Sequence, residues 1–285
     1  MNEAAQYQAG PIGFIGGGNM ARALIAGLLR RGAPARRLCV GEPAEAVRTA
    51  LARDFGIAVT ADNREALRDA RLVVLAVKPQ EVARVLRELR GALQEPLPVL
   101  LSIAAGVRIP DLARLCPPGM PIVRAMPNRP ALVGAGVTGL YAAPGLRPEL
   151  RTLVEIVAAS AGRSIWLRAE SELDVVTALS GSGPAYFFLL AEYLAQAACA
   201  LGLERETALL LAAETLHGAG QLARDGGALS DQRAAVTSRG GTTEAALRIF
   251  EAGGFEALVA RALGAAAGRS TELAAQLSEQ IRDSI

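Results

Sequence analysis

Short apolar runs alternate with longer amphipathic stretches over the first part of the chain. Short runs rich in β-branched residues predict buried strands, and the amphipathic stretches between them predict helices. Strands and helices that alternate in this way are typical of a mainly parallel sheet covered on both faces. The strands predicted from this pattern are residues 12–15, 37–40, 72–77, 99–103, 121–125, 136–141 and 164–167.

The pattern changes after Glu170, beyond which no further strand is predicted. Apolar residues there recur at helical spacing, and Pro184 stands where a proline commonly opens a helix. We therefore expect a dinucleotide-binding α/β domain at residues 1–168 and an all-helical domain at residues 169–285. The helices predicted in the second domain are residues 174–179, 184–201, 205–225, 242–251 and 255–281.

The predicted helix at residues 184–201 is apolar around most of its circumference. A helix of this kind must be buried, and five helices alone offer little interior for it. A second copy of the chain could complete the core through a symmetric interface. We therefore expect at least a dimer, and we expect the isolated first domain to be inactive.

The first predicted strand runs into a glycine-rich turn with the spacing Gly16-x-Gly18-x-x-Ala21, followed by a helical pattern. In dinucleotide-binding folds the first glycine makes the turn, the second admits the pyrophosphate, and a small third residue allows close packing. Glu42 follows the second predicted strand, where a carboxylate can bind a ribose 2′-hydroxyl. An ordinary glycine turn is the alternative, but the flanking strand and helix favour a dinucleotide site.

Residues 236–243 have the sequence VTSRGGTT and lead directly into an amphipathic helical pattern. The glycines expose the backbone, and the first turn of the helix offers unpaired N–H groups and the positive end of its dipole. The hydroxyls of Ser238, Thr242 and Thr243 could hold a small carboxylate from several sides. The alternative is an ordinary Ser/Thr helix cap after a loop.

Two further segments end predicted strands. Lys78, the only lysine in the chain, follows the strand at residues 72–77 and precedes Pro79. Cofactors bind at the carboxyl ends of strands in open α/β sheets, so Lys78 is a candidate contact, with a solvated surface lysine as the alternative. Asn128 lies between Pro127 and Arg129-Pro130, in a stiff loop that either holds an amide against a ligand or is simply a rigid turn.

Composition narrows the class of protein. The chain has 285 residues, 51% of them hydrophobic, with a net charge of +2 and no basic cluster, so nucleic acid is not an expected partner. No apolar run is long and uninterrupted enough to predict a membrane span, and the first ten residues carry no export signal. Three scattered cysteines and the single histidine, His217, form no metal motif and indicate a reduced, cytoplasmic setting without metal catalysis.

Five motifs together resemble the pyrroline-5-carboxylate reductase family. They are GFIGGGNM at residues 13–20, AVKP at 76–79, MPN at 126–128, LSGSGPAY at 179–186 and VTSRGGTT at 236–243. The resemblance spans essentially the whole chain from Gly10, and the last two motifs are specific to this family. It implies a Rossmann domain followed by a helical domain that interlocks two subunits. It also implies reduction of the C=N bond of 1-pyrroline-5-carboxylate to L-proline, with NADPH or NADH as the hydride donor and no metal.

The resemblance assigns roles to individual residues. Ser238 and the N–H groups of Gly241, Thr242 and Thr243 are implied to hold the substrate carboxylate, and the Thr243 hydroxyl to bond the ring nitrogen as the catalytic donor. Together with Glu42, which follows the second predicted strand, the candidate cofactor contacts are Ile15, Gly16, Gly17, Gly18, Asn19, Met20, Asn63, Ala76, Val77, Lys78, Pro79 and Asn128.

Three residues depart from the family pattern. Arg239 replaces a usual proline and Arg129 a usual threonine, which bears on substrate size and affinity. Glu42 disfavours a 2′-phosphate and favours NADH or dual use. Two other functions remain open: a different glycine-fingerprint oxidoreductase, such as a β-hydroxyacid dehydrogenase, and a catalytically silent dinucleotide sensor. The segment Ser238–Thr243 argues against the first, and the presence of Ser182, Ser238 and Thr243 argues against the second.

Overall fold

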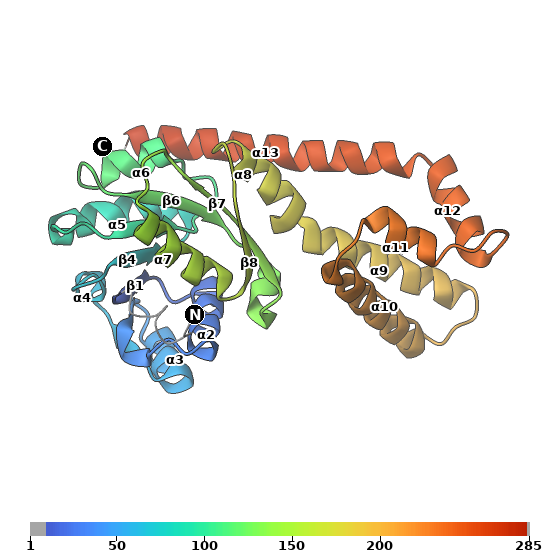
Figure 1. The fold of residues 1–285 in the computed structure, drawn as a ribbon, viewed down its shortest axis with the longest axis horizontal. Helices are drawn as coiled ribbons and strands as arrows, with labels where there is room; N and C mark the ends of the chain where they lie inside the picture. Colours follow the sequence, from blue (N-terminus) through green and yellow to red (C-terminus); the bar gives the residue numbers. More distant parts are fainter. Residues whose placement is uncertain (1–9, 284–285) are drawn as a thin grey trace. The chain divides into compact units, whose positions relative to one another are not determined.

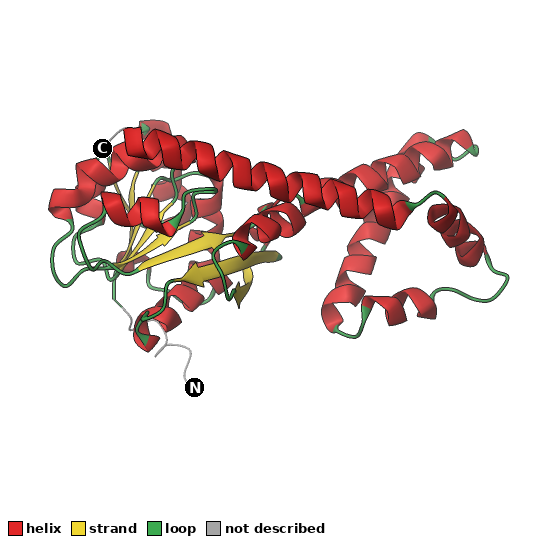
Figure 2. Cartoon of the chain, turned by 90° about the horizontal axis from the view of Figure 1, so that it is seen from above, coloured by secondary structure: helices red, strands yellow, loops and turns green. Residues whose placement is uncertain are grey.

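The computed structural model describes residues 10–283, so the expectation for an export signal falls almost wholly outside the described residues. The chain forms two compact units (Figure 1). The first consists of Met1–Gly181 together with Ala266–Ile285, and the second consists of Ser182–Ala265. Strands occur in the first unit, whereas the described part of the second is helical (Figure 2).

Within residues 10–283, one eight-stranded sheet has the order β3-β2-β1-β4-β5-β6-β7-β8. All neighbouring strands are parallel except β6 and β7, which are antiparallel. The predicted Rossmann-type, mainly parallel sheet is therefore confirmed. The strands are β1 (Ile12–Ile15), β2 (Leu38–Gly41), β3 (Ala58–Thr60), β4 (Leu72–Leu75), β5 (Val99–Ser102), β6 (Ile122–Met126), β7 (Gly136–Ala142) and β8 (Gly162–Trp166).

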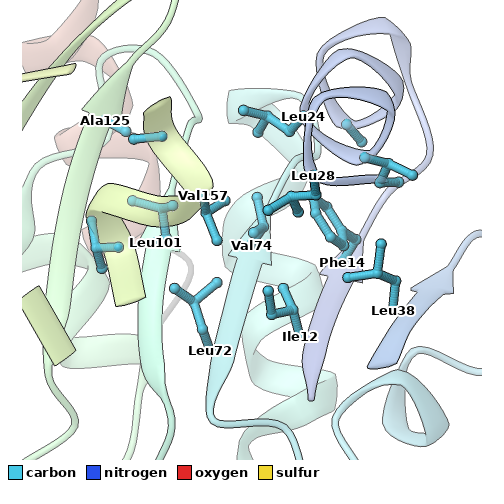
Figure 3. Close-up of a cluster of buried hydrophobic side chains, with 14 of the residues drawn as sticks. Ile12, Phe14, Leu24, Leu28, Leu38, Leu72, Val74, Leu101, Ala125 and Val157 are labelled. Atoms are coloured by element: carbon cyan, nitrogen blue, oxygen red, sulfur yellow. The ribbon is translucent and has the colours of Figure 1, made fainter. Parts of the chain in front are cut away.

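Alternate residues of the central strands enter two different cores, so both faces of the sheet are covered. Leu72 and Val74 of β4 belong to one apolar cluster, and Val73 and Leu75 to the other. Figure 3 shows the first cluster, where side chains of the helix after β1 pack over the strands. A strand buried on both faces is continuously apolar, which is why β4 and β5 were recognisable as short apolar runs.

Helices connect the strands of the first unit. Those of the first half are α2 (Asn19–Arg30), α3 (Glu45–Phe55), α4 (Asn63–Ala66), α5 (Val82–Leu89), α6 (Ile109–Leu115) and α7 (Pro148–Ala159), with 3₁₀ turns η2 (Ala35–Arg37), η3 (Pro79–Glu81), η4 (Arg90–Ala92) and η5 (Arg129–Val133). After β8 come α8 (Glu172–Val176) and η6 (Thr177–Gly181), which is a π-helical turn. α2 and α7 contribute to the first cluster, and α5 and α6 to the second.

The second unit contains α9 (Gly183–Ala200), α10 (Arg205–Asp225), α11 (Leu229–Ala235), α12 (Thr242–Ala252) and the beginning of α13 (Phe255–Asp283). α9 and α10 pack side by side. A largely apolar groove of about 650 Å³ lies between them, and large side chains such as Phe187, Phe188 and Tyr193 are exposed along α9. Four of these helices match the predicted ranges closely, whereas α11 was not predicted.

By length and composition alone, one stretch of the described chain, Glu172–Ala200, is apolar enough to cross a membrane. A helix that is apolar on all sides also occurs where two subunits bury it between them. The exposed apolar side chains of α9 therefore do not by themselves indicate a membrane.

The compact units differ from the domain division predicted at residues 168 and 169. Residues 169–181 belong to the first unit because Glu170 pairs with Arg124 of β6 at 2.7 Å and Leu173 is buried. The last part of α13 also belongs there, since Ile281 lies in the second apolar cluster and Ser278 donates to the buried carboxylate of Asp111. A hydrophobic pattern read along the chain does not reveal such long-range packing.

Candidate active site

The glycine loop between β1 and α2 has the geometry that its spacing predicts. Gly16 has φ +96°, and a Cβ there would lie 2.8 Å from the carbonyl oxygen of Ala76. The chain therefore makes its turn where β1 and β4 end side by side, and the Ala76 N–H donates to the carbonyl of Ile15 at 2.8 Å. Only glycine fits this position without strain.

Gly18 has a different task. It is the N-cap of α2, with φ −67°, and a Cβ built there would meet no atom within 4 Å. No side chain caps the helix, so Asn19 and Met20 begin α2 with backbone N–H groups free of a side-chain cap. An uncapped helix start beside an open, exposed glycine is the arrangement that receives a pyrophosphate.

Glu42 lies against this loop, immediately after β2. Its Oε2 accepts a hydrogen bond from the Gly17 N–H at 2.9 Å, and its Oε1 accepts one from the Ala44 N–H at 2.9 Å. The carboxylate therefore links the glycine turn to the start of α3. A carboxylate at the end of the second strand is placed to accept a ribose hydroxyl.

Asn63, at the start of α4, lies against β2. Its Oδ1 is buried and has no hydrogen-bond partner among the described residues. Gly41 makes room for this side chain, because a Cβ on Gly41 would stand 2.4 Å from Oδ1. Buried acceptors without partners are rare, so Asn63 has an unused acceptor that a bound dinucleotide can satisfy. The residues present thus fit a dinucleotide.

The segment after β4 carries Ala76 and Val77, both half-buried, and the exposed Lys78. Lys78 is the N-cap of η3, and Pro79 occupies the first position of that turn. The segment begins beside Gly16, so the predicted contacts Ile15, Ala76 and Val77 lie at the same edge of the sheet.

Asn128 has a structural task in this chain. Its Oδ1 accepts from the Val137 N–H at 2.9 Å, and its Nδ2 donates to the carbonyl of Ser180 at 3.1 Å. The buried amide therefore ties β7 to η6, and the expected contact between Asn128 and the cofactor stays a prediction. The neighbouring Arg129 is exposed.

The hydroxyl-rich segment of the second unit forms the turn between α11 and α12. Gly240 has φ +74°, and its N–H donates to Oε2 of Glu244 at 2.8 Å. The Gly241 N–H donates to the Ser238 carbonyl at 3.0 Å, so within this turn it already has an acceptor. No side chain caps α12, which argues against the ordinary Ser/Thr cap and leaves Thr242 and Thr243 at an uncapped helix start.

The structure brings the fingerprint, Glu42, Asn63 and the segment at 76–79 together in the first unit, and places 236–243 in the second. His217 lies on α10, exposed, with its Nε2 3.0 Å from the amide nitrogen of Gln221. Among the described residues, no group of three His, Cys, Asp or Glu side chains is arranged to hold a metal ion.

Comparison with known proteins identifies the family. The chain is 45% identical to the pyrroline-5-carboxylate reductase of Pseudomonas aeruginosa over 94% of its own length and 98% of the relative's. The chain belongs to the pyrroline-5-carboxylate reductase family. The Mycobacterium tuberculosis member is 40% identical, with 92% of this chain and 96% of the relative covered.

Solved structures of the family agree. The pyrroline-5-carboxylate reductase of Coxiella burnetii superposes with a TM-score of 0.90 at 40% identity, covering 93% of this chain and 98% of that one. The Plasmodium falciparum enzyme, solved with NADP bound, has a TM-score of 0.78 at 27% identity and the same coverage. Residues 170–273 match the family model for pyrroline-5-carboxylate reductase dimerisation, and residues 11–106 match that for NADP oxidoreductase, coenzyme F420-dependent.

Sequence reasoning did not identify Arg48 as part of this region. Its Nη1 donates to the carbonyl oxygens of Glu42 at 2.8 Å and Pro43 at 2.7 Å, in the loop that carries the Glu42 carboxylate. One signal was available: helical side chains lean toward the N-terminus, so a residue in the first turn of α3 reaches back over the loop before it.

Proposed function

We propose that this chain reduces 1-pyrroline-5-carboxylate to L-proline with NADPH or NADH, the last step of proline biosynthesis, in the cytoplasm. The observation that carries the proposal is 45% identity to a pyrroline-5-carboxylate reductase over nearly the whole of both chains. The chain is thus an oxidoreductase that acts on a C=N bond and needs no metal for it. The start of α12 has no side-chain cap and carries threonine hydroxyls, so its N–H and O–H donors are available for the carboxylate and ring nitrogen of a small imino acid.

The dinucleotide site is proposed to use the backbone more than side chains. The N–H groups of residues 18–20 at the start of α2 hold the pyrophosphate, whereas the Gly17 N–H stays with the Glu42 carboxylate. Glu42 and Asn63 offer acceptors to the adenosine ribose and base. Lys78 adds a positive charge at the carboxyl end of β4. When bound, the reduced nicotinamide supplies a hydride.

The substrate site is proposed to lie at residues 238–243. The N–H groups of Thr242 and Thr243, with the Ser238 hydroxyl, hold the carboxylate at the positive end of the α12 dipole. Gly241 shapes the turn, and its N–H turns toward the carboxylate only if it leaves the Ser238 carbonyl. The Thr243 hydroxyl donates to the ring nitrogen. Reduction adds a hydride to the imine carbon and a proton to the nitrogen, so these residues orient the ring and no strong base is needed.

Self-association is supported by the match to the dimerisation family model and by the apolar side chains exposed on α9. Burying that surface against a second copy would remove apolar area of the kind that drives stable dimers. Light scattering at micromolar concentration tests this. We expect at least twice the chain mass of 29.5 kDa, and a fully active monomer would contradict the shared core.

A cofactor-absorbance assay tests the activity. Purified protein is given NADH or NADPH with pyrroline-5-carboxylate or with its six-membered homologue. In a separate assay it is given NAD⁺ or NADP⁺ with a 3-hydroxyacid. We expect oxidation of the cofactor with pyrroline-5-carboxylate and formation of proline in stoichiometric amount. Turnover only of a 3-hydroxyacid would support a related dehydrogenase, and nucleotide binding without turnover would support a silent sensor.

A further inference from the structure

Arg48 contacts the backbone of Glu42, the residue whose carboxylate is expected to bind the adenosine ribose. It is half-buried on the first turn of α3, and its Nη1 bridges the carbonyls of Glu42 and Pro43. The Glu42 carboxylate faces the glycine loop from the same turn, through its bond to the Gly17 N–H. A carboxylate and a guanidinium thus flank one short loop at the end of β2.

Two nitrogen atoms of the Arg48 guanidinium have no hydrogen-bond acceptor among the described residues. Arginine carries five N–H donors in a planar fork, and among the described residues the hydrogen bonds found for the Arg48 side chain all come from Nη1. Nε and Nη2 therefore remain to bind an anion. A fork of this kind bonds a phosphate through two parallel hydrogen bonds, and such charge-assisted bonds are about twice as strong as neutral ones.

The surrounding charges also favour an anion at this position. Ala44, the N-cap of α3, makes no side-chain cap, so the positive end of the helix dipole points at the loop. A cation in the first turn of a helix is unfavourable by itself, and a bound anion would relieve this. Glu42 and the exposed Glu45 oppose an anion, and the N–H groups of Gly17 and Ala44 partly offset the charge of the Glu42 carboxylate.

We propose that Arg48 binds the adenosine 2′-phosphate of NADPH, and that Glu42 and Arg48 together let this enzyme use both cofactors. Glu42 accepts the free ribose hydroxyl of NADH. With NADPH, the Arg48 guanidinium stays over the loop and turns its free edge toward the phosphate, offsetting the repulsion from Glu42. The inference builds on the dinucleotide site of the proposed function but does not depend on which imine is reduced.

The test compares two ligands that differ only in the 2′-phosphate: adenosine 2′,5′-bisphosphate and adenosine 5′-monophosphate. Calorimetry measures both on the full chain, with Arg48→Gln as the variant, because glutamine keeps an amide donor for the loop carbonyls and loses the charge. The matched control is Arg53→Gln, an exposed arginine on the same helix that pairs with Asp54.

We expect Arg48→Gln to weaken the bisphosphate about 10- to 100-fold, the usual loss of a charged hydrogen bond, and to change the monophosphate less than twofold. The ratio of kcat/KM for NADPH over NADH should fall by the same factor, and Arg53→Gln should change neither. If Arg48→Gln does not fold, Arg48→Lys replaces it, with a smaller but still phosphate-selective loss.

Equal weakening of both ligands would show that Arg48 only supports the loop, and would overturn the proposal. Unchanged binding of both ligands would overturn it as well. A phosphate-selective loss in a protein that fails to reduce pyrroline-5-carboxylate would leave the inference standing and reject the proposed reaction instead.

Discussion

Two glycines of the fingerprint should respond to the same substitution in opposite ways. In Gly16→Ala the new Cβ would stand 2.8 Å from the Ala76 carbonyl oxygen, at a backbone φ of +96°. A left-handed conformation costs an alanine about 1–2 kcal/mol, and overpacking against a fixed backbone costs about 1–3 kcal/mol more. We therefore expect a loss of about 2–5 kcal/mol in the free energy of unfolding, together with weaker dinucleotide binding as the segment after β4 is displaced.

Gly18→Ala is the matched case. Its φ of −67° suits alanine, and the new Cβ meets no protein atom within 4 Å. The less favourable helix cap and the reduced entropy of the unfolded chain nearly cancel, so stability should change by no more than about 0.5 kcal/mol. The added methyl group would stand in the path of the pyrophosphate, and we expect NADPH to bind at least about tenfold more weakly.

Thermal unfolding of the cofactor-free protein and calorimetric titration with NADPH separate the two effects. Gly16→Ala should melt lower by roughly 5–15 °C, and Gly18→Ala should melt with the wild type. Wild-type NADPH affinity in Gly18→Ala would refute the placement of the pyrophosphate. A wild-type melting temperature in Gly16→Ala would refute the steric reasoning from the Ala76 carbonyl.

Three other changes can be tested. Thr243→Ala should lower kcat/KM for pyrroline-5-carboxylate about 10- to 100-fold without weakening NADPH binding, because a donor to the ring nitrogen is lost. Thr243→Ser should retain most of the activity. An unaltered kcat/KM in the alanine variant would remove Thr243 from the mechanism. The wild-type protein should use NADH at least as well as NADPH, and Glu42→Ser should shift the ratio of the two kcat/KM values toward NADPH. A strong NADPH preference that Glu42→Ser does not alter would mean that Glu42 does not contact the ribose. Burial raises the pKa of the Cys116 thiol to about 12, so at pH 8 the reactive thiolate is nearly absent and mass spectrometry should find Cys116 unalkylated by iodoacetamide in the native protein.

The sheet was predictable because its strands carry their own signal. Strands buried on both faces are apolar throughout, and glycine and proline mark their ends, so β1, β4 and β5 stand out in the sequence. β3 was missed because it has three residues, Ala58–Thr60, none of them buried. α11 was missed because Leu229–Ala235 buries no residue in the chain and has no apolar stripe.

The site was predictable where chemistry follows local spacing and unpredictable where it depends on distant contacts. The glycine spacing located the turn, and the strand end located Glu42. Arg124 and Glu170 are 46 positions apart, and only the fold reveals that the same Glu170 oxygen accepts from the Ile109 N–H at 2.7 Å. The structural role of Asn128 also depends on a partner 52 positions away, Ser180.

The first compact unit is interrupted in the sequence, and this affects how the protein is made. A ribosome releases the sheet and its helices long before it reaches the end of α13, yet Ile281 belongs to the second apolar cluster and Ser278 to the buried Asp111. Until synthesis reaches Ile281, the part of the second apolar cluster that this residue packs against is uncovered. The emerging chain is therefore expected to need protection from aggregation during translation. A product truncated after the second unit should be degraded by proteases faster than the full chain.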